Sequence, residues 1–510
     1  MQEKSEKSAK PVHQEAEMYK HRHGQMTVED FILPFSGELL RENRWVKLAG
    51  LVPWDWFESQ YAELFGAVGN PAKPARVALG ALLIQTRLGS TDEETVQQIT
   101  ENVYMQYFLG YQEYQSKPPF TPSMMVFFRK RITPAMLAEI NEKIRIEASG
   151  SDVPKEPPTG GGTAGCNDAN ADAETKPNSG KLILDATCAP QDIRYPTDVS
   201  LLNEAREKLE GMIDEIWAQS GFQGEKPRTY RENARRDFNR FIRNRKPKGK
   251  KIRRAIREQL GYVRRDIEII DQWLIELGID CLSEAQIERL ITIHRLYAQQ
   301  QEMYATKTHS INHRIVSISQ PHVRPIVRGK AGCATEFGAK IVVSMVNGHA
   351  TVERLSWENF NEGSDLIEYA DRYRERYGCY PSAILADKAF RTRDNLAFCK
   401  KNGIRLTGPP LGRPKTTVDP QTKKIERMDS AERNAIEGKF GEGKRGYGLG
   451  RIMTKLQDTS EVSIHLQFLV MNLMHRLRLL FFAFCKKLRF DARFASFCTL
   501  SCMLCVFQRC

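Results

Sequence analysis

The pattern of apolar and polar positions predicts a mainly helical first part of the chain. Across residues 28–147 apolar side chains recur at helical spacing, most regularly in Ala75–Arg87. Ser90 followed by Glu93 has the form of a capping box, which predicts a second helix running on through Phe108. A compact helical domain is therefore expected, either a reader of DNA ends or a helical packing domain.

A second helical region follows a polar linker. Residues 148–180 are rich in Gly, Pro, Asn and Asp, which predicts a flexible linker. Residues 199–310 return to helical periodicity and predict a helical insertion. Within it Pro227–Arg257 carries fourteen Lys or Arg against two acids, which favours contact with phosphates over the alternative of a solvated helical surface. The aromatic residues expected on one helical face there are Tyr230, Phe238 and Phe241.

Short apolar runs predict a sheet in the remaining parts of the chain. The runs expected to form strands are Leu182–Leu184, Arg314–Ser319, Ala339–Asn347, His349–Leu355, Ser382–Asp387 and Ile404–Thr407. Asn347-Gly348, between two of these runs, is a hairpin turn signal. Two runs lead into an acid, Asp185 and Asp387, and ligands of α/β folds gather at the carboxyl ends of strands. Both acids are therefore candidate site residues, with an aspartate that only caps a turn as the alternative.

Helical periodicity returns near the end of the chain. Asp429–Phe440 predicts a helix with Arg433 and Glu437 at i and i+4, hence on one face. Without other information an exposed ion pair is the simpler interpretation of these two residues. A Gly-rich basic turn is expected next, at Gly441–Gly450, with Lys444 and Arg445 in it.

Composition and charge favour a cytosolic protein with a nucleic-acid partner. The chain has 510 residues, a formal net charge of +13 and a pI near 9.1, which favours a polyanion and nucleic acid before membrane. The apolar run Phe468–Cys485 is interrupted by His475, Arg476 and Arg478, so a core helix within Ser460–Leu480 is expected rather than a membrane span. No signal peptide is expected, and the eleven cysteines, an odd number, indicate reduced thiols.

Three carboxylates are candidates for one catalytic group. Asp185 and Asp387 on neighbouring strands and Glu437 on a packed helix can converge although they are far apart in sequence. Mg²⁺ prefers carboxylate oxygens, water and substrate phosphate as ligands. Two such ions about 3.5–4 Å apart activate a water or a 3′-hydroxyl and stabilise the leaving oxygen in displacement at phosphorus. Acids in a basic protein suit this chemistry, because the metals would neutralise them where a phosphate approaches.

The residues that surround these acids resemble DDE transposases of bacterial insertion sequences. The similar segments are DATCAPQDIRYPTDVSLLNEARE (residues 185–207), ADKAFRTRDN (residues 386–395), Glu336–Lys340 and Gly412–Lys415. Arg433, Glu437 and Lys444 fit the last three places of the family's Tyr-Arg-Glu-Lys signature, and Ser430 stands in the tyrosine place. The resemblance covers about Asp30–Leu480.

The resemblance implies a mixed, α+β architecture with an RNase H-like core. The domains it implies are a polar segment 1–27, a helical DNA-end-binding domain 28–147, a linker 148–180, a catalytic domain 181–480 with the basic insertion at about 199–310, and a Cys-rich tail 481–510. For that tail a poorly ordered end is expected, with zinc binding at Cys498, Cys502, Cys505 and Cys510 as the alternative.

The resemblance also implies the site and its partners. Asp185, Asp387 and Glu437 would hold Mg²⁺ or Mn²⁺, and the DNA contacts would be Arg433, Lys444, Arg445, Lys415 and Arg413. The expected function is cleavage at element ends and transfer of the 3′-hydroxyl to target DNA. The partners would be double-stranded terminal inverted repeats and target DNA, with a homo-oligomer in a synaptic complex in the bacterial cytoplasm, associated with the nucleoid and not with a membrane. The alternatives are a metal-dependent endonuclease and a non-catalytic DNA-binding repressor.

Overall fold

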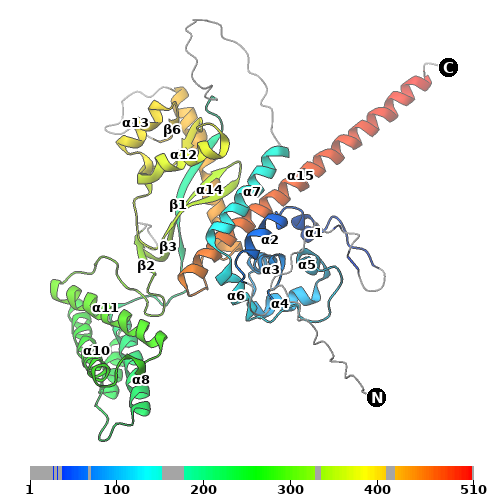
Figure 1. Ribbon diagram of the computed structural model, residues 1–510. Helices are drawn as coiled ribbons and strands as arrows, with labels where there is room; N and C mark the ends of the chain where they lie inside the picture. Colours follow the sequence, from blue (N-terminus) through cyan, green and yellow to red (C-terminus); the bar gives the residue numbers. More distant parts are fainter. Residues whose placement is uncertain are drawn as a thin grey trace, which may run out of the picture. The chain divides into compact units, whose positions relative to one another are not determined.

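The chain divides into two compact units that are described separately. A computed structural model describes residues 27, 31–32, 37–66, 71–151, 177–327, 335–408 and 420–507, with side chains from 484 onward outside the description. Unit 1 comprises Met1–Cys166 and His465–Cys510, and unit 2 comprises Asn167–Ile464. The expected mixture of helices and sheet is confirmed (Figure 1).

Unit 1 is helical throughout its described residues. Its helices are α1 (Arg44–Ala49), α2 (Trp54–Ala62), α3 (Ala75–Leu88), α4 (Asp92–Glu101), α5 (Val103–Phe108), α6 (Met124–Arg131), α7 (Pro134–Ser151) and the later part of α15 (Gln457–Phe507). Helix α3 is almost completely buried from Ala75 to Ile84, and large aromatic side chains such as Phe57, Phe108 and Phe128 surround it at 0–1% exposure. An apolar helix buried on all sides is the centre of a helical core.

Two expectations for this helical unit are wrong in detail. The cap of α4 is Thr91, one residue after the expected Ser90, and its hydroxyl accepts from the Glu94 backbone N–H. The helix also does not run on to Phe108, because Asn102 leaves the helical conformation and its side chain caps α5 by accepting from the Tyr104 N–H. Asparagine favours such caps since its short side chain competes for backbone partners.

Helix α15 is the long apolar helix expected from the sequence. Within the described residues it is the one helix that length and hydropathy would allow to cross a membrane, over Gln457–Ala483, and 44% of its apolar window is buried. In unit 1 its Phe468, Leu469 and Met471 are buried, and the Asn472 side-chain amide donates to Asn141 Oδ1 of α7 at 2.8 Å. These contacts are typical of a core helix. The side chains of the tail cysteines lie outside the described residues.

Unit 2 contains a six-stranded mixed sheet with β1 at its centre. The strands are β1 (Lys181–Pro190), β2 (Arg324–Val327), β3 (Thr335–Val346), β4 (His349–Ser356), β5 (Ala383–Leu385) and β6 (Arg405–Leu406). β1 pairs antiparallel with β3 and parallel with β5, β6 extends the parallel side, and β2 and β4 share the outer edge of β3. The expected hairpin is confirmed, since Asn347 and Gly348 have φ of 51° and 81° at the β3–β4 turn.

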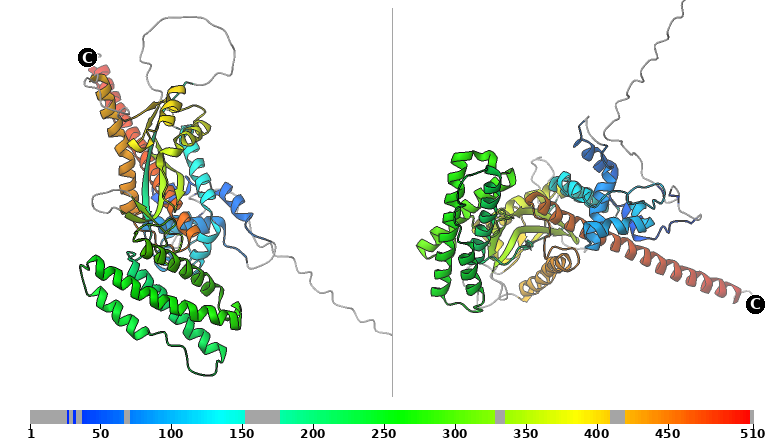
Figure 2. Two further views of the ribbon diagram at one scale, coloured as in Figure 1. Left: turned by 90° about the vertical axis from the view of Figure 1, so that its left-hand side faces the viewer. Right: turned by 90° about the horizontal axis from the view of Figure 1, so that it is seen from below.

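Helices cover both faces of this sheet (Figures 1 and 2). Leu182, Leu184 and Ile384 point into a core formed with α12 (Leu366–Tyr377) and α13 (Arg393–Lys401). Because side chains alternate along a strand, the residues between them point to the opposite face. That face is covered by α14 (Pro420–Gly446), which contacts β1 and β5.

A helical insertion leaves the sheet between β1 and β2. Its elements are α8 (Asp198–Ser220), α9 (Arg231–Ile242), α10 (Gly249–Leu277), the short η2 (Ile279–Cys281) and α11 (Glu284–Thr306). They enclose an apolar core of their own, in which Leu209, Val263 and Ile293 are buried. The expectation that three aromatic residues share one helical face holds for two of them. Phe238 and Phe241 pack against that core, because α9 must bury an apolar stripe, whereas Tyr230 precedes the helix with a φ of 52°.

One expected strand is absent from unit 2. Arg314–Ser319 forms irregular backbone although Ile315, Val316 and Ile318 are buried, and the strand β2 begins only at Arg324. The apolar run packs its side chains without pairing to β3, whose edge is already shared by β2 and β4. A strand needs both buried side chains and a partner strand, and residues 314–319 have only the buried side chains.

The insertion also buries an ionisable side chain, that of an aspartate without hydrogen-bond partners. Asp266 on α10 is 0% exposed, and neither of its carboxylate oxygens has a partner in the structure. Burial, together with nearby Glu210 and against the opposing effect of Arg206, raises the pKa of Asp266 to about 8. Asp266 therefore carries a proton in the folded protein at neutral pH.

We expect Asp266→Asn to remove a pH dependence of stability. The folded state keeps a proton that the unfolded chain releases above the ordinary aspartate pKa of 3.8, so wild-type stability falls as pH rises toward about 8 and then levels off. Denaturation between about pH 5 and about pH 8 should show the variant gaining on the wild type by up to about 1.4 kcal/mol per pH unit. The control is Asp271→Asn, an aspartate 45% exposed and bonded to His294. Parallel pH profiles for wild type and Asp266→Asn would contradict the assignment.

Candidate active site

Asp185 on β1 lies near Asp387, which follows the parallel strand β5 by two residues, because β5 ends at Leu385 and not at Asp387 as expected. The pairing of β1 with β5 runs from Lys181 opposite Ala383 to Ile183 opposite Leu385. Continued by two residues, the same register places Asp185 beside Asp387. Adjacent strands lie about 4.8 Å apart, and both positions point to the face covered by α14. The sheet therefore brings together two carboxylates that are far apart in the sequence.

The expectation that Asp185 ends its strand is wrong. β1 continues to Pro190 because residues from Ile183 to Pro190 pair with β3, whose partner positions run from Met345 to Gly338. What ends near Asp185 is the parallel pairing with β5, which is three residues long. Asp185 thus lies just beyond the end of the parallel pairing between β1 and β5. Ligands of α/β folds gather at such carboxyl ends of parallel strands.

The backbone after Asp387 turns sharply and is held in place. The Asp387 carboxylate accepts from the Lys388 N–H at 2.6 Å and caps the short helix η4 (Lys388–Phe390). Asn395, 2% exposed on α13, donates its side-chain amide to Phe390 O at 2.8 Å and to Gly363 O at 2.7 Å. A side chain at Gly363 would not fit, since a Cβ there would lie 2.3 Å from Ala389 O. Asn395 therefore fixes the segment that follows the second aspartate.

Helix α14 places Arg433 between the acids. Arg433 Nη2 donates to Glu437 Oε1 at 3.2 Å, and Arg433 Nη1 lies 3.9 Å from Asp185 Oδ2. The Glu437 side chain is 55% exposed and the Asp185 side chain 16% exposed. The ion pair on one helix face that the sequence indicated is thus present, and it adjoins the first aspartate. Glu437 shares this face but points to the guanidinium.

Negative charge accumulates around Asp185. Burial raises the pKa of Asp185 to about 6, while the Ala186 backbone N–H and Arg433 oppose the rise and Asp387 and Glu362 add to it. Glu362 reaches the site from η3 (Glu362–Asp365), where its Oε1 pairs with Lys340 Nζ at 2.9 Å. Burial and the neighbouring carboxylates therefore outweigh the compensating charge of Arg433.

The other expected phosphate contacts are partly visible. Helix α14 continues through Gly446, so the turn expected from Gly441 begins only at Tyr447. Packing of the helix, where Lys439 and Phe440 are buried, outweighs the low helix propensity of its glycines. Lys444 Nζ lies 3.9 Å from Glu336 Oε1 of β3, and Arg445 Nε donates to Gly441 O at 3.2 Å. The expected contacts Arg413 and Lys415 lie outside the described residues.

Comparison with known proteins identifies the family. Residues 35–131 match the model of a Transposase domain (DUF772), and residues 384–474 match the model of a Transposase DDE domain. The chain is also 32% identical over 165 residues to "Uncharacterized protein ORF8 in nfe locus" of Rhizobium meliloti, an alignment that covers 32% of this chain and 70% of that protein. The chain belongs to the DDE transposases of bacterial insertion sequences. No solved structure matches it significantly.

The matched regions of the transposase cover only part of the candidate site. The DDE match begins one residue after Ala383, within β5, and includes Asp387, Arg433, Glu437 and Lys444. Asp185 lies outside both matched regions, so its place beside Asp387 follows from the strand register alone.

The candidate carboxylates of the transposase suit a divalent cation, provided that Glu437 changes its partner. Asp185 and Asp387 supply the hard oxygen ligands that Mg²⁺ prefers. Among the described residues no three His, Cys, Asp or Glu side chains already stand close enough to hold a metal ion together. Glu437 would have to exchange Arg433 for the cation before it could become the third ligand.

Sequence reasoning missed Glu362 and Asn395 as parts of this transposase site. Glu362 and Asn395 are brought to the site because η3 packs against η4. The two segments are about thirty residues apart in sequence and approach each other closely at Gly363. Asn395 is the last residue of the segment ADKAFRTRDN, which was assigned through its aspartate only. No local pattern marks Glu362, since it lies in an irregular polar stretch.

Proposed function

We propose that this transposase cleaves DNA at the ends of its element and joins the freed 3′-hydroxyl to target DNA, using Asp185, Asp387 and Glu437. The observation that carries this proposal is the proximity of Asp185 on β1 to Asp387, two residues beyond the adjacent parallel strand β5, with α14 across both strands. Two carboxylates on one open edge of a sheet, in a basic protein, suit phosphoryl transfer better than a purely structural role.

The proposal includes an RNase H-like catalytic core. In support, β1 is central, with an antiparallel hairpin on one side and two parallel strands on the other, and helices cover both faces. The candidate acids come from the central strand, its parallel neighbour and a helix packed against both. This arrangement joins the three sequence segments that resemble the family.

Each residue has a role in the proposed reaction. Bound Mg²⁺ or Mn²⁺ would activate a water or a 3′-hydroxyl and stabilise the leaving oxygen. Asp185 and Asp387 would hold the cations, and Glu437 would complete the ligand set if it exchanged Arg433 for a cation. The Arg433 guanidinium would then be available for a phosphate oxygen of the DNA, the geometry for which guanidinium groups are best suited. The structure thus supports Arg433 as a cation that neutralises the acids before DNA binds.

The remaining cations and partners complete the proposal. Lys444 and Arg445 on the last turn of α14, together with Arg413 and Lys415, contact phosphates near the site. The helical unit 1 binds the terminal inverted repeats, and a homo-oligomer holds two ends in a synaptic complex in the cytoplasm, at the nucleoid. The match of residues 35–131 to a transposase domain supports a role of unit 1 in this reaction.

The experiment that tests this function uses the full-length protein. DNA that carries both ends of the element encoding this chain is incubated with protein and Mg²⁺ or Mn²⁺, together with a target plasmid. Joined products are expected. Cleavage without joining would instead support a metal-dependent endonuclease, and binding without cleavage would support a non-catalytic repressor.

A further inference from the structure

We propose that the helices α9 and α10 of the insertion form a second DNA-binding surface, which holds the backbone of double-stranded DNA without reading its sequence. The surface is called the basic face here and consists of the Lys and Arg residues of 228–257, all of which are exposed except Arg231. The choice of DNA as the polyanion rests on the proposed function, whereas the binding surface itself rests on the observations below.

Most charges of the basic face are not neutralised by the protein. Residues 177–327 are described without a gap, and within them the ion pairs of this face are Arg231 with Asp214 at 2.7 Å, Arg240 with Asp237 at 3.4 Å and Arg254 with Glu258 at 2.7 Å. The exposed cations around the α9–α10 connection, among them Arg245, Lys246 and Lys250, have no acidic partner there. Crowded like charges destabilise the folded state unless a counter-charge binds.

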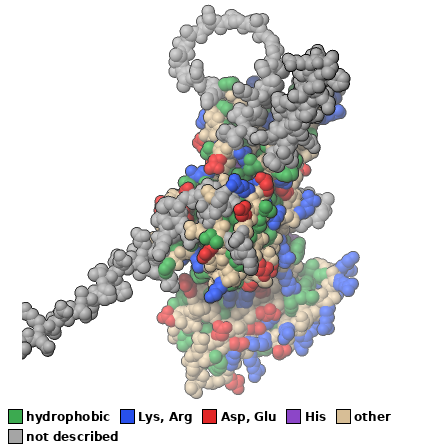
Figure 3. Space-filling model, turned by 90° about the vertical axis from the view of Figure 1, so that its right-hand side faces the viewer, with side chains coloured by type: hydrophobic (Ala, Val, Ile, Leu, Met, Phe, Trp, Pro, Cys, Tyr) green, Lys and Arg blue, Asp and Glu red, His purple; other side chains and the backbone are tan. Residues whose placement is uncertain are grey.

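The basic face stands on a rigid base. Phe238, Phe241 and Ile252 pack into the apolar core of the insertion, and Tyr262 of α10 donates to Asp237 Oδ2 of α9 at 3.0 Å. The cations therefore project from two helices that are fixed to each other rather than from a mobile tail. In Figure 3 the lower, fainter part of the molecule is the insertion, and many Lys and Arg side chains stand along its edge.

The burial of the apolar side chains argues against a membrane surface as the partner. A helix that lies on a membrane needs a free apolar stripe to insert among the lipids. The stripes of α9 and α10 are already occupied by the core of the insertion. One large apolar side chain of α9, Ile242, is exposed, at 48%.

The same burial argues against single-stranded nucleic acid. Proteins that bind single strands stack bases on exposed aromatic side chains. Of the three aromatic residues in this stretch, Phe238 and Phe241 pack against the core. Tyr230 is 47% exposed, and the Arg265 guanidinium lies over its ring, 4.6 Å from the ring centre. The face therefore offers one exposed ring, not a row of rings for successive bases, and what it mainly exposes is charge, which suits the phosphates of a duplex.

The dimensions of the basic face suit a duplex. From Lys248, at the start of α10, to Arg257 the cations of the basic face extend over about 14 Å at 1.5 Å per residue. Duplex DNA carries about one charge per 1.7 Å of its axis, so such a face can meet several phosphates at once. Most of the exposed cations are arginines, whose planar guanidinium binds phosphate oxygens in pairs.

The test removes charge from the basic face and compares it with an equal removal elsewhere. The test variant is Arg245→Gln, Lys250→Gln and Lys251→Gln together, at exposed positions without ion pairs. The matched control, with the same loss of three charges, is Arg289→Gln, Arg295→Gln and Lys307→Gln, at exposed positions on α11 and at its end. Binding of the full-length proteins to a fluorescent DNA duplex of arbitrary sequence is measured at several salt concentrations.

We expect the test variant to bind at least about tenfold more weakly, with the slope of log affinity against log salt reduced by about 2 to 3. The control variant should keep the wild-type slope. Equal slopes for both variants would overturn the inference. An RNA duplex of the same sequence that competes better than the DNA would also overturn it, in favour of RNA as the partner.

A parallel assay separates this inference from the proposed function. Asp387→Asn should lose DNA joining and keep the salt slope, because the carboxylate is not part of the basic face. If Asp387→Asn behaves so while the test variant binds normally, the inference fails and the proposed function stands. If Asp387→Asn still joins DNA while the test variant binds weakly, the proposed function fails and the inference stands.

Discussion

Replacement of Asp387 by asparagine should reduce DNA cleavage and joining by at least about a thousandfold, without loss of DNA binding. The amide keeps the shape of the side chain and can still accept from the Lys388 N–H, so the cap of η4 survives. What disappears is the negative charge that would hold a cation beside Asp185. Rates on end-bearing DNA with Mg²⁺ and with Mn²⁺, beside a binding curve, measure the effect.

The matched control for this prediction is Asp394→Asn. Asp394 lies in the same segment, in the first turn of α13, and is exposed to solvent. Its replacement should leave the rate within a few fold of the wild type, since it neither joins the sheet edge nor faces α14. Wild-type rates for Asp387→Asn would refute the assignment of the second acid.

Replacement of Glu353 by alanine should destabilise unit 2 by about 3–5 kcal/mol. The Glu353 side chain on β4 is 1% exposed and pairs with Arg372 and Arg376 of α12. It also accepts from the Ser344 hydroxyl of β3 at 2.6 Å. Its loss would leave two guanidinium groups and a hydroxyl without their buried partner, which costs more than the pair itself contributes. Chemical denaturation followed by circular dichroism measures the loss.

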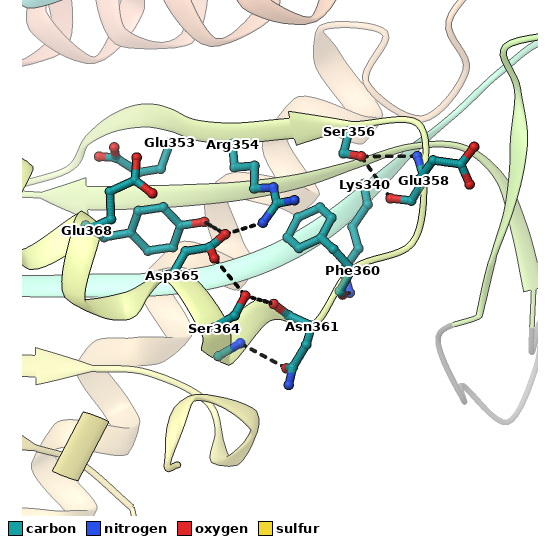
Figure 4. A network of polar contacts seen from close by, with 12 residues as sticks. Lys340, Glu353, Arg354, Ser356, Glu358, Phe360, Asn361, Ser364, Asp365 and Glu368 are labelled. Carbon is teal, nitrogen blue, oxygen red and sulfur yellow. Dashed lines mark hydrogen bonds and ion pairs between the residues drawn. The ribbon is translucent and has the colours of Figure 1, made fainter. Parts of the chain in front are cut away.

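Glu368→Ala is the matched control for this stability prediction. Glu368 pairs with the same Arg372 from one turn earlier on α12, but its side chain is 58% exposed. Figure 4 shows Glu353 and Glu368 near each other, on the strand and on the helix. An exposed pair at i and i+4 contributes about 0.3–0.5 kcal/mol. Similar losses for both variants would mean that burial of Glu353 does not matter.

The proximity of Asp185 and Asp387 could be predicted from the sequence, because it depends on local patterns. Leu182–Leu184 and Ser382–Asp387 are short apolar runs that end in acids, and strand periodicity fixes which face each acid meets. The length of β1 could not be predicted from the sequence, because the residues after Asp185 form a strand only by pairing with β3. The same holds for the failed strand Arg314–Ser319, whose apolar pattern satisfies burial without a free edge to pair with.

The details of α14 depended on packing rather than on propensity. Its glycines at 441, 443 and 446 predicted a turn, yet the helix continues through Gly446 because its buried side chains hold it to the rest of the unit. The ion pair of Arg433 with Glu437 followed from spacing alone. The proximity of Arg433 to Asp185 could not be predicted from spacing, since it depends on how α14 lies across the sheet.

The place of the insertion in the chain has a consequence for the order of folding. The pairing of β1 with β3 closes a loop that contains all four long helices of the insertion, and closing a long loop costs more entropy than forming local contacts. The insertion has its own core and is made of contacts close in sequence, which form fastest. During synthesis Asp185 leaves the ribosome long before β5 exists, so the two aspartates can meet only after the helices between them are made. The candidate active site is therefore among the last parts of the molecule to assemble, and a nascent chain carries its first acid without its partner.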